Sequence, residues 1–224
     1  MFQGFSPDTF SFLNNLKENN NKTWFETNRE IYRNHILGPL QDLITELTPF
    51  MLTIDPLFTV NPKKAVSRIN RDIRFSKDKS PYRANMWLVF KRLYIDWKVE
   101  PAFFFEIYPD YYRYGMGFYN VPRETMDKLR AMINGQNKNF QKIHSLYQEQ
   151  KTFKIEGEKY KKILNLSLSE DLNEWYQRKD LYFVCNKELD NQLYGASLVD
   201  MLIEDFKLLV PFYNFLVGLR KSVP

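Results

Sequence analysis

The sequence predicts an α+β protein: a single domain with a mostly antiparallel central sheet of about five strands, flanked by N- and C-terminal helices. Helical patterns fill residues 1–55, strand patterns dominate residues 56–120, and helical patterns then return. Helices and strands that are segregated in this way are typical of the α+β class. Aromatic residues make up 17% of the chain, and aromatic side chains suit half-buried strands.

The first 55 residues predict helices. Ser6 suits an N-cap and Pro7 the first helical position, and Phe10, Leu13 and Leu16 follow at helical spacing. A second helix is expected from about Lys22. The dipeptide at positions 38–39, Gly-Pro, predicts a break or kink before a third helical stretch.

The middle of the chain predicts strands. Residues 65–75 alternate in polarity, with Ile69, Ile73 and Phe75 on one face and polar side chains on the other. Further strand patterns, rich in aromatic residues, cover residues 86–92, 102–109 and 111–119. The connections between these segments are short, which favours antiparallel pairing.

The last hundred residues predict mainly helices. Residues 121–180 carry helical patterns, residues 181–186 read as a last strand, and residues 195–220 form an amphipathic C-terminal helix. We see neither an internal repeat nor a low-complexity linker in the sequence. We therefore expect one domain over residues 1–224.

The positive charge is concentrated in one part of the sequence. The chain has a net charge of +5, but residues 61–92 contain ten Lys or Arg and two Asp, so the rest of the chain is net negative. A general coat for nucleic acid or membrane would be spread more evenly. The excess charge therefore points to a local feature.

Other sequence features indicate a soluble, cytoplasmic protein without a membrane partner. Cys185 is the single cysteine, so no intramolecular disulfide can form, which fits a reducing compartment. The N-terminal residues lack the pattern of a signal peptide. The most apolar stretch, residues 208–219, is too short to span a bilayer.

The sequence lacks the common catalytic and cofactor motifs. It contains no phosphate-binding loop, no dinucleotide fingerprint and no nucleophile elbow. His35 and His144 lie far apart without ligand spacing, so we expect neither a metal nor a cofactor. Cys185 reads as a small buried side chain rather than a nucleophile. Glu106, inside an aromatic strand, either faces solvent or is paired in a cleft, and both interpretations stay open.

The segment Ser67–Arg83, "SRINRDIRFSKDKSPYR", is the strongest functional signal and is called the basic segment below. Its candidate ligand-binding residues are Arg68, Arg71, Arg74, Lys77, Lys79 and Arg83. Asp72 can accept bidentate hydrogen bonds from a neighbouring arginine. Ser80 and Pro81 suit the start of a short helix, whose free N–H groups would favour a phosphate or carboxylate.

These residues resemble a known family. "RINRDIRFSKDKSPYR" is similar, without a gap, to the signature of the domain-of-unknown-function family numbered 2461, and the flanking segments are similar over essentially the whole chain. One departure is Asn70, where an aromatic residue is common. The resemblance implies a single α+β domain and implies neither a reaction nor catalytic residues.

Two interpretations of the basic segment stay open. Its arginines either hold an anion or form a structural ion-pair network with acidic residues elsewhere in the chain. Local acids alone cannot pair the ten basic residues of this region. Both arrangements would shift pKa values alike, so pKa values do not distinguish them. We favour the anion site because of the charge imbalance of this region.

The sequence is consistent with three alternative functions. The first is a cleft edged by Arg68, Arg71, Arg74 and Lys77 that holds a phosphorylated or carboxylated small molecule. Asp72 or Glu106 would then serve as general base or orienting group, which leaves open whether the protein is an enzyme.

The second function is nucleic-acid binding, with bases stacked on Tyr82, Trp87, Phe90 and Tyr94, although these rings also suit a core. The third is a structural or interaction protein, in which the apolar C-terminal helix serves a homodimer or another partner. We favour the first.

Overall fold

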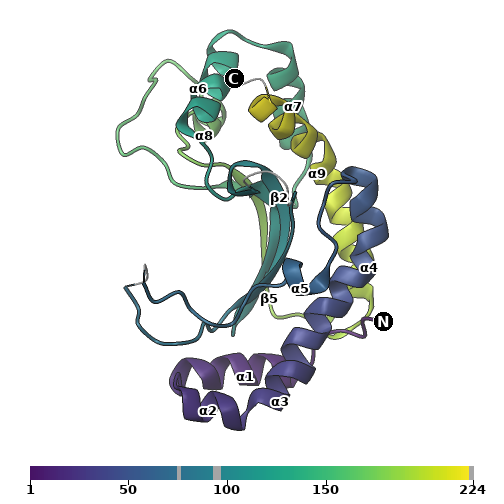
Figure 1. Cartoon of the computed structure of the whole chain (residues 1–224). Helices are drawn as coiled ribbons and strands as arrows, with labels where there is room; N and C mark the ends of the chain where they lie inside the picture. Colours follow the sequence, from purple (N-terminus) through teal and green to yellow (C-terminus); the bar gives the residue numbers. More distant parts are fainter. Residues whose placement is uncertain (75–76, 93–96, 222–224) are drawn as a thin grey trace. The chain divides into compact units, whose positions relative to one another are not determined.

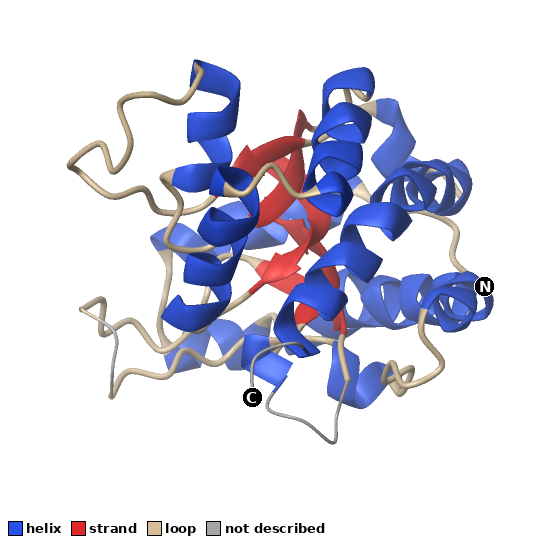
Figure 2. Cartoon of the chain, turned by 90° about the horizontal axis from the view of Figure 1, so that it is seen from above, coloured by secondary structure: helices blue, strands red, loops and turns tan. Residues whose placement is uncertain are grey.

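The strands form one open antiparallel sheet (Figures 1 and 2). Their order in the sheet is β1-β2-β3-β5-β4. In this computed structural model, the described residues are 1–74, 77–92 and 97–221. The strands are β1 (Met86–Phe90), β2 (Pro101–Ile107), β3 (Tyr111–Phe118), β4 (Lys154–Glu156) and β5 (Tyr182–Glu188). The predicted α+β class with about five strands is confirmed.

One of the predicted strands is wrong. Residues 65–75 form isolated bridges instead of a regular strand, and Phe75 of that prediction lies outside the described residues. The fifth strand is instead β4, which pairs with β5 in the register Ile155↔Phe183. Because β4 has only three residues, it is too short to show an alternating pattern in the sequence.

The helices lie before, between and after these strands. The helices before β1 are α1 (Pro7–Glu18), α2 (Lys22–Thr27), α3 (Arg29–Tyr32), η1 (Arg33–Leu37), α4 (Gly38–Ile54) and α5 (Pro62–Ala65). Between β1 and β2 lies η2 (Trp97–Val99). After β3 they are α6 (Arg123–Asn134), α7 (Lys138–Glu149), α8 (Glu170–Tyr176), η3 (Asn191–Tyr194) and α9 (Ser197–Lys221).

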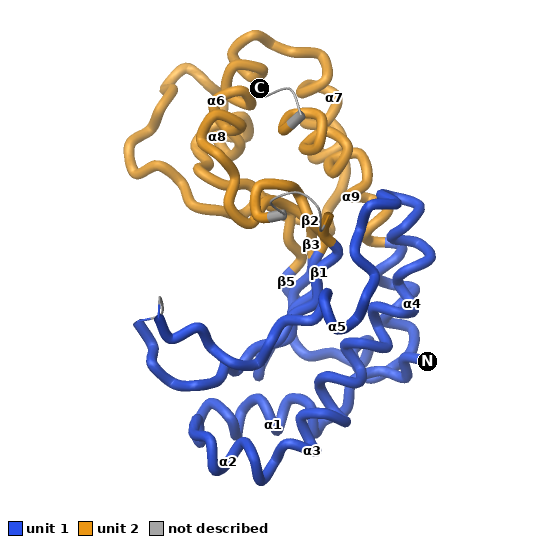
Figure 3. Tube along the Cα trace, viewed as in Figure 1, with its two compact units in different colours: residues 1–90, 104–114, 186–204 blue, residues 91–103, 115–185, 205–224 orange. Residues whose placement is uncertain are grey.

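The chain divides into two compact units (Figure 3). Unit 1 contains residues 1–90, 104–114 and 186–204, and unit 2 contains residues 91–103, 115–185 and 205–224. Each unit has its own buried aromatic and aliphatic side chains, which are described separately below. Among the described helices, none is both long and apolar enough to cross a membrane.

The core of unit 1 is built from α1, α4 and the adjoining strands. Along α4, Leu40, Leu43 and Leu47 recur at helical spacing and are fully buried. Phe5 stacks on Phe105 of β2 with ring centroids 5.8 Å apart. Burial of such large apolar side chains removes them from water and is the main favourable term for this unit.

A π-helical turn, η1, joins α3 to α4. Pro39 has no N–H group and cannot donate to the carbonyl of His35, four residues earlier. Thr9 of α1 donates a hydrogen bond to that His35 carbonyl at 2.5 Å. The Gly38 N–H bonds back to Arg33, which is the five-residue spacing of a π-helix. The predicted break at residues 38–39 is therefore a local change of helix type.

The core of unit 2 surrounds Trp175 of α8, which is fully buried. Its ring meets Phe140 and Tyr147 of α7 edge-on, with centroids 5.4 Å apart in both pairs. Phe183 of β5 contacts the same indole at 5.6 Å and Phe212 of α9 at 4.7 Å. These ring contacts tie α7, α8, α9 and β5 together.

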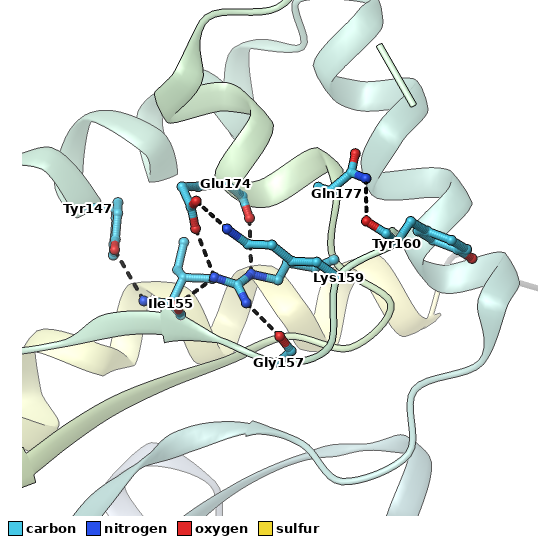
Figure 4. A network of polar contacts seen from close by, with 8 residues as sticks. Tyr147, Ile155, Gly157, Lys159, Tyr160, Glu174 and Gln177 are labelled. Carbon is cyan, nitrogen blue, oxygen red and sulfur yellow. Dashed lines mark hydrogen bonds and ion pairs between the residues drawn. The ribbon is translucent and has the colours of Figure 1, made fainter. Parts of the chain in front are cut away.

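Arg178 of unit 2 is 8% exposed. It donates to a network of polar contacts that includes Ile155, Gly157 and Glu174 (Figure 4). Its Nη1 donates to Gly157 O at 2.5 Å, and its Nη2 donates to Ile155 O at 2.9 Å and to Glu174 Oε2 at 2.8 Å. Its Nε donates to Glu174 O at 3.2 Å. The guanidinium therefore links β4 to α8.

Arg130 of α6 is a second buried arginine in unit 2, at 7% exposure. It donates to the main-chain oxygens of Tyr176 at 2.9 Å and of Arg178 at 2.5 Å, and to Asp127 Oδ1 at 2.6 Å. All three of its nitrogens have an acceptor inside the protein. Both arginines are therefore structural donors that fix irregular backbone.

Candidate functional site

The basic segment runs out from α5 and returns to β1 within unit 1 (Figures 1 and 3). Isolated bridges pair Val66 with Leu88 and Asn70 with Tyr82. Between them, Arg83 N donates to Ile69 O at 2.9 Å. The predicted strand fails to become continuous because Pro81 lacks an N–H group and so can only accept a ladder hydrogen bond.

Two aspartates shape the turns of the basic segment. Asp72 Oδ1 accepts from Arg74 N at 3.3 Å, and Asp78 Oδ1 accepts from Ser80 N at 2.9 Å. Such side-chain acceptors replace regular secondary structure with turns. The helix predicted to start at Ser80 and Pro81 is therefore wrong, and the chain there is extended.

Tyr82 anchors the returning half of the segment to the N-terminal helices. Its N–H donates to Asn20 Oδ1 at 3.0 Å, and its carbonyl accepts from Asn20 Nδ2 at the same distance. Its ring stacks on Phe25 of α2 with centroids 4.2 Å apart. These contacts fix the segment beside α2.

Arg74 forms an ion pair with its neighbour Asp72. Its Nε and Nη2 donate to the two carboxylate oxygens of Asp72 at 2.9 and 2.8 Å, which is the predicted bidentate pair. The hydrogen bonds from Arg74 lower the pKa of Asp72 to about 2. Both side chains are exposed, so the pair neutralises two charges at the surface.

Arg71 and Lys79 are also used within the segment. Arg71 donates to Ser80 O at 3.2 Å and Tyr82 O at 3.0 Å, and its Nη2 lies 3.0 Å from Asp78 Oδ2. Lys79 donates to Ile73 O at 2.7 Å. These two cations hold the segment in its folded conformation.

The other three candidate cations of the basic segment are Arg68, Lys77 and Arg83. Within residues 1–74, 77–92 and 97–221, the side chains of Arg68, Lys77 and Arg83 have no ion-pair partner. Arg83 lies over the Trp87 ring at 4.8 Å, a cation–π distance. Arg68 interacts with Asp72 only at longer range, as the smallest of the causes that lower the pKa of that carboxyl.

Arg68 borders a hollow of about 490 Å³ in unit 1. The hollow is lined by Phe25, Arg29, Tyr32, Arg33, Leu37, Gln41, Lys63, Val66, Ser67, Arg68, Ile69 and Asn70. It therefore lies between α2, α3, η1, the start of α4, α5 and the outgoing half of the basic segment. Its size falls in the range of small-molecule sites.

The charged part of this lining is exclusively basic. Arg29 and Arg33 each have an acidic partner three residues earlier in the chain, Glu26 and Glu30 respectively. Lys63, like Arg68, has no ion-pair partner among the described residues. Exposed helical pairs contribute little and are readily exchanged for another anion.

The sequence prediction missed the helical half of this lining. Arg29 and Arg33 are four residues apart and share a helix face with Phe25 and Tyr32. The sequence shows this four-residue spacing, but no sequence pattern indicates that this helix face lies beside the basic segment. Burial raises the pKa of Tyr32 to about 12, so its hydroxyl stays neutral and able to donate.

Glu106, one of two predicted catalytic candidates, is paired rather than solvent-facing. The carboxylate is 9% exposed and accepts from Arg113 Nε at 2.7 Å and from Asn85 Nδ2 at 2.6 Å. Burial and the Glu106 charge raise the pKa of Tyr108 above its usual value. Neither Glu106 nor Asp72, the other candidate, is among the residues that line the hollow.

Two of the rings proposed to stack bases are buried instead. Tyr82 is 5% exposed and Phe90 is fully buried, because both face the core of unit 1. Trp87 is half-buried beneath Arg83, and Tyr94 lies outside the described residues. Among described residues, no group of three His, Cys, Asp or Glu side chains is placed to hold a metal ion.

The fold and the lining define an α+β protein with a basic hollow in its helical half. A sequence model of the family described as conserved hypothetical protein (DUF2461) matches residues 8–215. The chain belongs to this family, as its sequence signature indicated. In a comparison with curated proteins, none matched the chain.

Proposed function

We propose that the protein binds a small phosphorylated or carboxylated molecule in the hollow bordered by Arg68. The observation that carries this proposal is the placement of two cations without ion-pair partners in the described structure, Arg68 and Lys63, in one lining. An anion there would receive charge-assisted hydrogen bonds, which are stronger than neutral ones. The single cysteine supports a reducing compartment such as the cytoplasm for this activity.

The rest of the lining supports a ligand with an apolar or aromatic body. Phe25, Val66 and Ile69 are at most 9% exposed and form an apolar wall beside the cations. Mixed sites of this kind use the apolar wall for affinity and a few charged groups for orientation. Since Asp72 and Glu106 lie outside the lining, the proposal assigns binding and no catalytic step.

Charge reversal at Arg68 tests the proposal. We expect inorganic pyrophosphate and citrate to raise the melting temperature of the wild-type protein at low ionic strength. Arg68→Glu should weaken binding about 10- to 100-fold, because a hydrogen bond to a charged group contributes about 1.5–3 kcal/mol.

Lys77→Glu provides the matched control. It makes the same charge change on the same segment at an exposed position outside the lining. Its affinity should stay within about twofold of wild type, since exposed charges are screened by solvent. Equal losses in both variants would mean that only the net charge matters, and the hollow would then have no specific role.

A further inference from the structure

A second hollow, of about 720 Å³, lies in unit 2 between α6, α7 and α9. Three helical stripes line it. Lys128 and Met132 come from α6, and Lys142, Ile143 and Leu146 are the principal residues from α7. The α9 stripe recurs every three to four residues and consists of Val210, Pro211, Asn214, Phe215, Gly218 and Leu219.

Gly218 leaves part of the α9 side of this hollow without a side chain. A Cβ atom placed on Gly218 would meet no atom within 4 Å, so the backbone of α9 borders empty space there. Glycine in a helix interior is one of the least favourable residues for helix stability. Its lack of a side chain leaves room for the atoms of a bound molecule to approach the helix closely.

The floor of the hollow is apolar and its charged groups are both basic. Met132, Leu146 and Phe215 are half-buried, which leaves apolar surface uncovered. Lys128 and Lys142 have no ion-pair partner in the part of the chain that the structure describes. An occupant that matches both properties has an apolar chain and an anionic head.

The lysines also argue against a second copy of the chain as the occupant. A symmetric dimer through this face would bury Lys128 and Lys142 of both copies in one interface, and the described part of the lining contains no acidic residue to pair with them. Lysine is also depleted in the centres of protein interfaces. The volume of about 720 Å³ is that of a small-molecule site.

We infer that this hollow binds a long-chain carboxylate, with the acyl chain on the floor made by α7 and α9 and the carboxylate at Lys128 and Lys142. The site shares no residue with the hollow at Arg68 and does not depend on the function proposed for it. The acyl chain should make the larger contribution, because each buried methylene adds to the hydrophobic term.

Calorimetric titration with monomeric dodecanoate tests this inference on the full-length protein. We expect saturable binding that weakens roughly fifteenfold for each two methylenes removed from the chain, at about 0.8 kcal/mol per buried methylene, and none with acetate. Gly218→Leu should abolish the binding by filling the hollow. Because leucine is a better helix former than glycine, this variant should keep or raise the melting temperature.

Charge variants separate the anionic head from the apolar chain. The double variant Lys128→Glu/Lys142→Glu should weaken dodecanoate binding more than about tenfold, since each reversal replaces an attraction with a repulsion. Lys154→Glu, at an exposed lysine outside the lining, should bind like wild type. Absent binding by wild type, or unchanged binding in either the leucine or the double variant, would overturn the inference.

Discussion

The basic segment of unit 1 and the Arg130–Arg178 network of unit 2 are both rich in arginine, but they use it differently. In unit 2, Arg178 donates four hydrogen bonds to groups of the protein, and Arg130 donates three. In the basic segment, Arg68 donates none that the described structure contains and borders a hollow. The two regions therefore differ in the supply of internal acceptors for their arginines.

The same contrast divides the basic segment itself. Arg71, Arg74 and Lys79 have acceptors within the same segment and stabilise its folded conformation. Arg68 has none and is instead placed beside α2 and α3. An arginine-rich motif is therefore neither wholly structural nor wholly available for a ligand, and each guanidinium has to be followed to its acceptors.

The largest effect is expected at Arg178. Arg178→Met keeps the apolar stem but leaves the carbonyls of Ile155 and Gly157 without their buried donor. We expect a loss of about 3 kcal/mol in the free energy of unfolding. Urea denaturation followed by tryptophan fluorescence would measure it as a lower midpoint at an unchanged slope. A midpoint equal to that of wild type would show that this network does not stabilise unit 2.

Arg71→Ala should have an intermediate effect. It removes two hydrogen bonds to main-chain oxygens and the pair with Asp78, so we expect a loss of about 1–2 kcal/mol. Hydrogen exchange of the Arg83 amide, which donates to Ile69, should accelerate because the segment opens more often. If that amide exchanges as in wild type, Arg71 does not hold the segment closed.

The smallest effect concerns the exposed pair of Asp72 and Arg74. The folded-state pKa of Asp72, about 2, is below the ordinary value of 3.8. The pair therefore favours the folded state above about pH 4, and this contribution is lost as the pH falls through 2. Because both side chains are exposed, solvent screens the pair, and the unfolding midpoint of Arg74→Ala at pH 7 should lie close to that of wild type.

A carbon-detected NMR titration of the Asp72 carboxyl would check this pair. In wild type the inflection should lie near pH 2, and in Arg74→Ala it should move up toward 3.8. An unshifted inflection in the variant would show that Arg74 does not contact Asp72 in solution.

Much of the fold could be predicted from the sequence because its signals are local. The cap at Ser6, the leucine spacing of α4 and the aromatic-rich runs of β1, β2 and β3 all act over a few residues. The error at residues 65–75 has a local cause too. The residues do alternate in polarity, but Asp72 and Asp78 accept main-chain hydrogen bonds that turn the backbone, and Ile73, predicted on the apolar face, is 46% exposed.

The candidate site was only half predictable for a different reason. Arg68 and its neighbours stand out as a charge cluster, and the bidentate pair of Asp72 with Arg74 follows from their spacing. Arg29, Arg33 and the face they share lie more than thirty residues earlier in the chain. Their meeting with Arg68 depends on the contact of Tyr82 with α2, a tertiary interaction that no local pattern encodes.

The central claim is that Arg68, and not the internally bonded arginines, receives an anion. Side-chain Nε–H resonances of the arginines, followed by NMR during a pyrophosphate titration, compare all of them in one sample. We expect the Arg68 resonance to shift and saturate, while those of Arg74 and Arg178 stay in place because their donors already have acceptors. A titration in which Arg68 does not move, or moves linearly along with every exposed arginine, would contradict the claim.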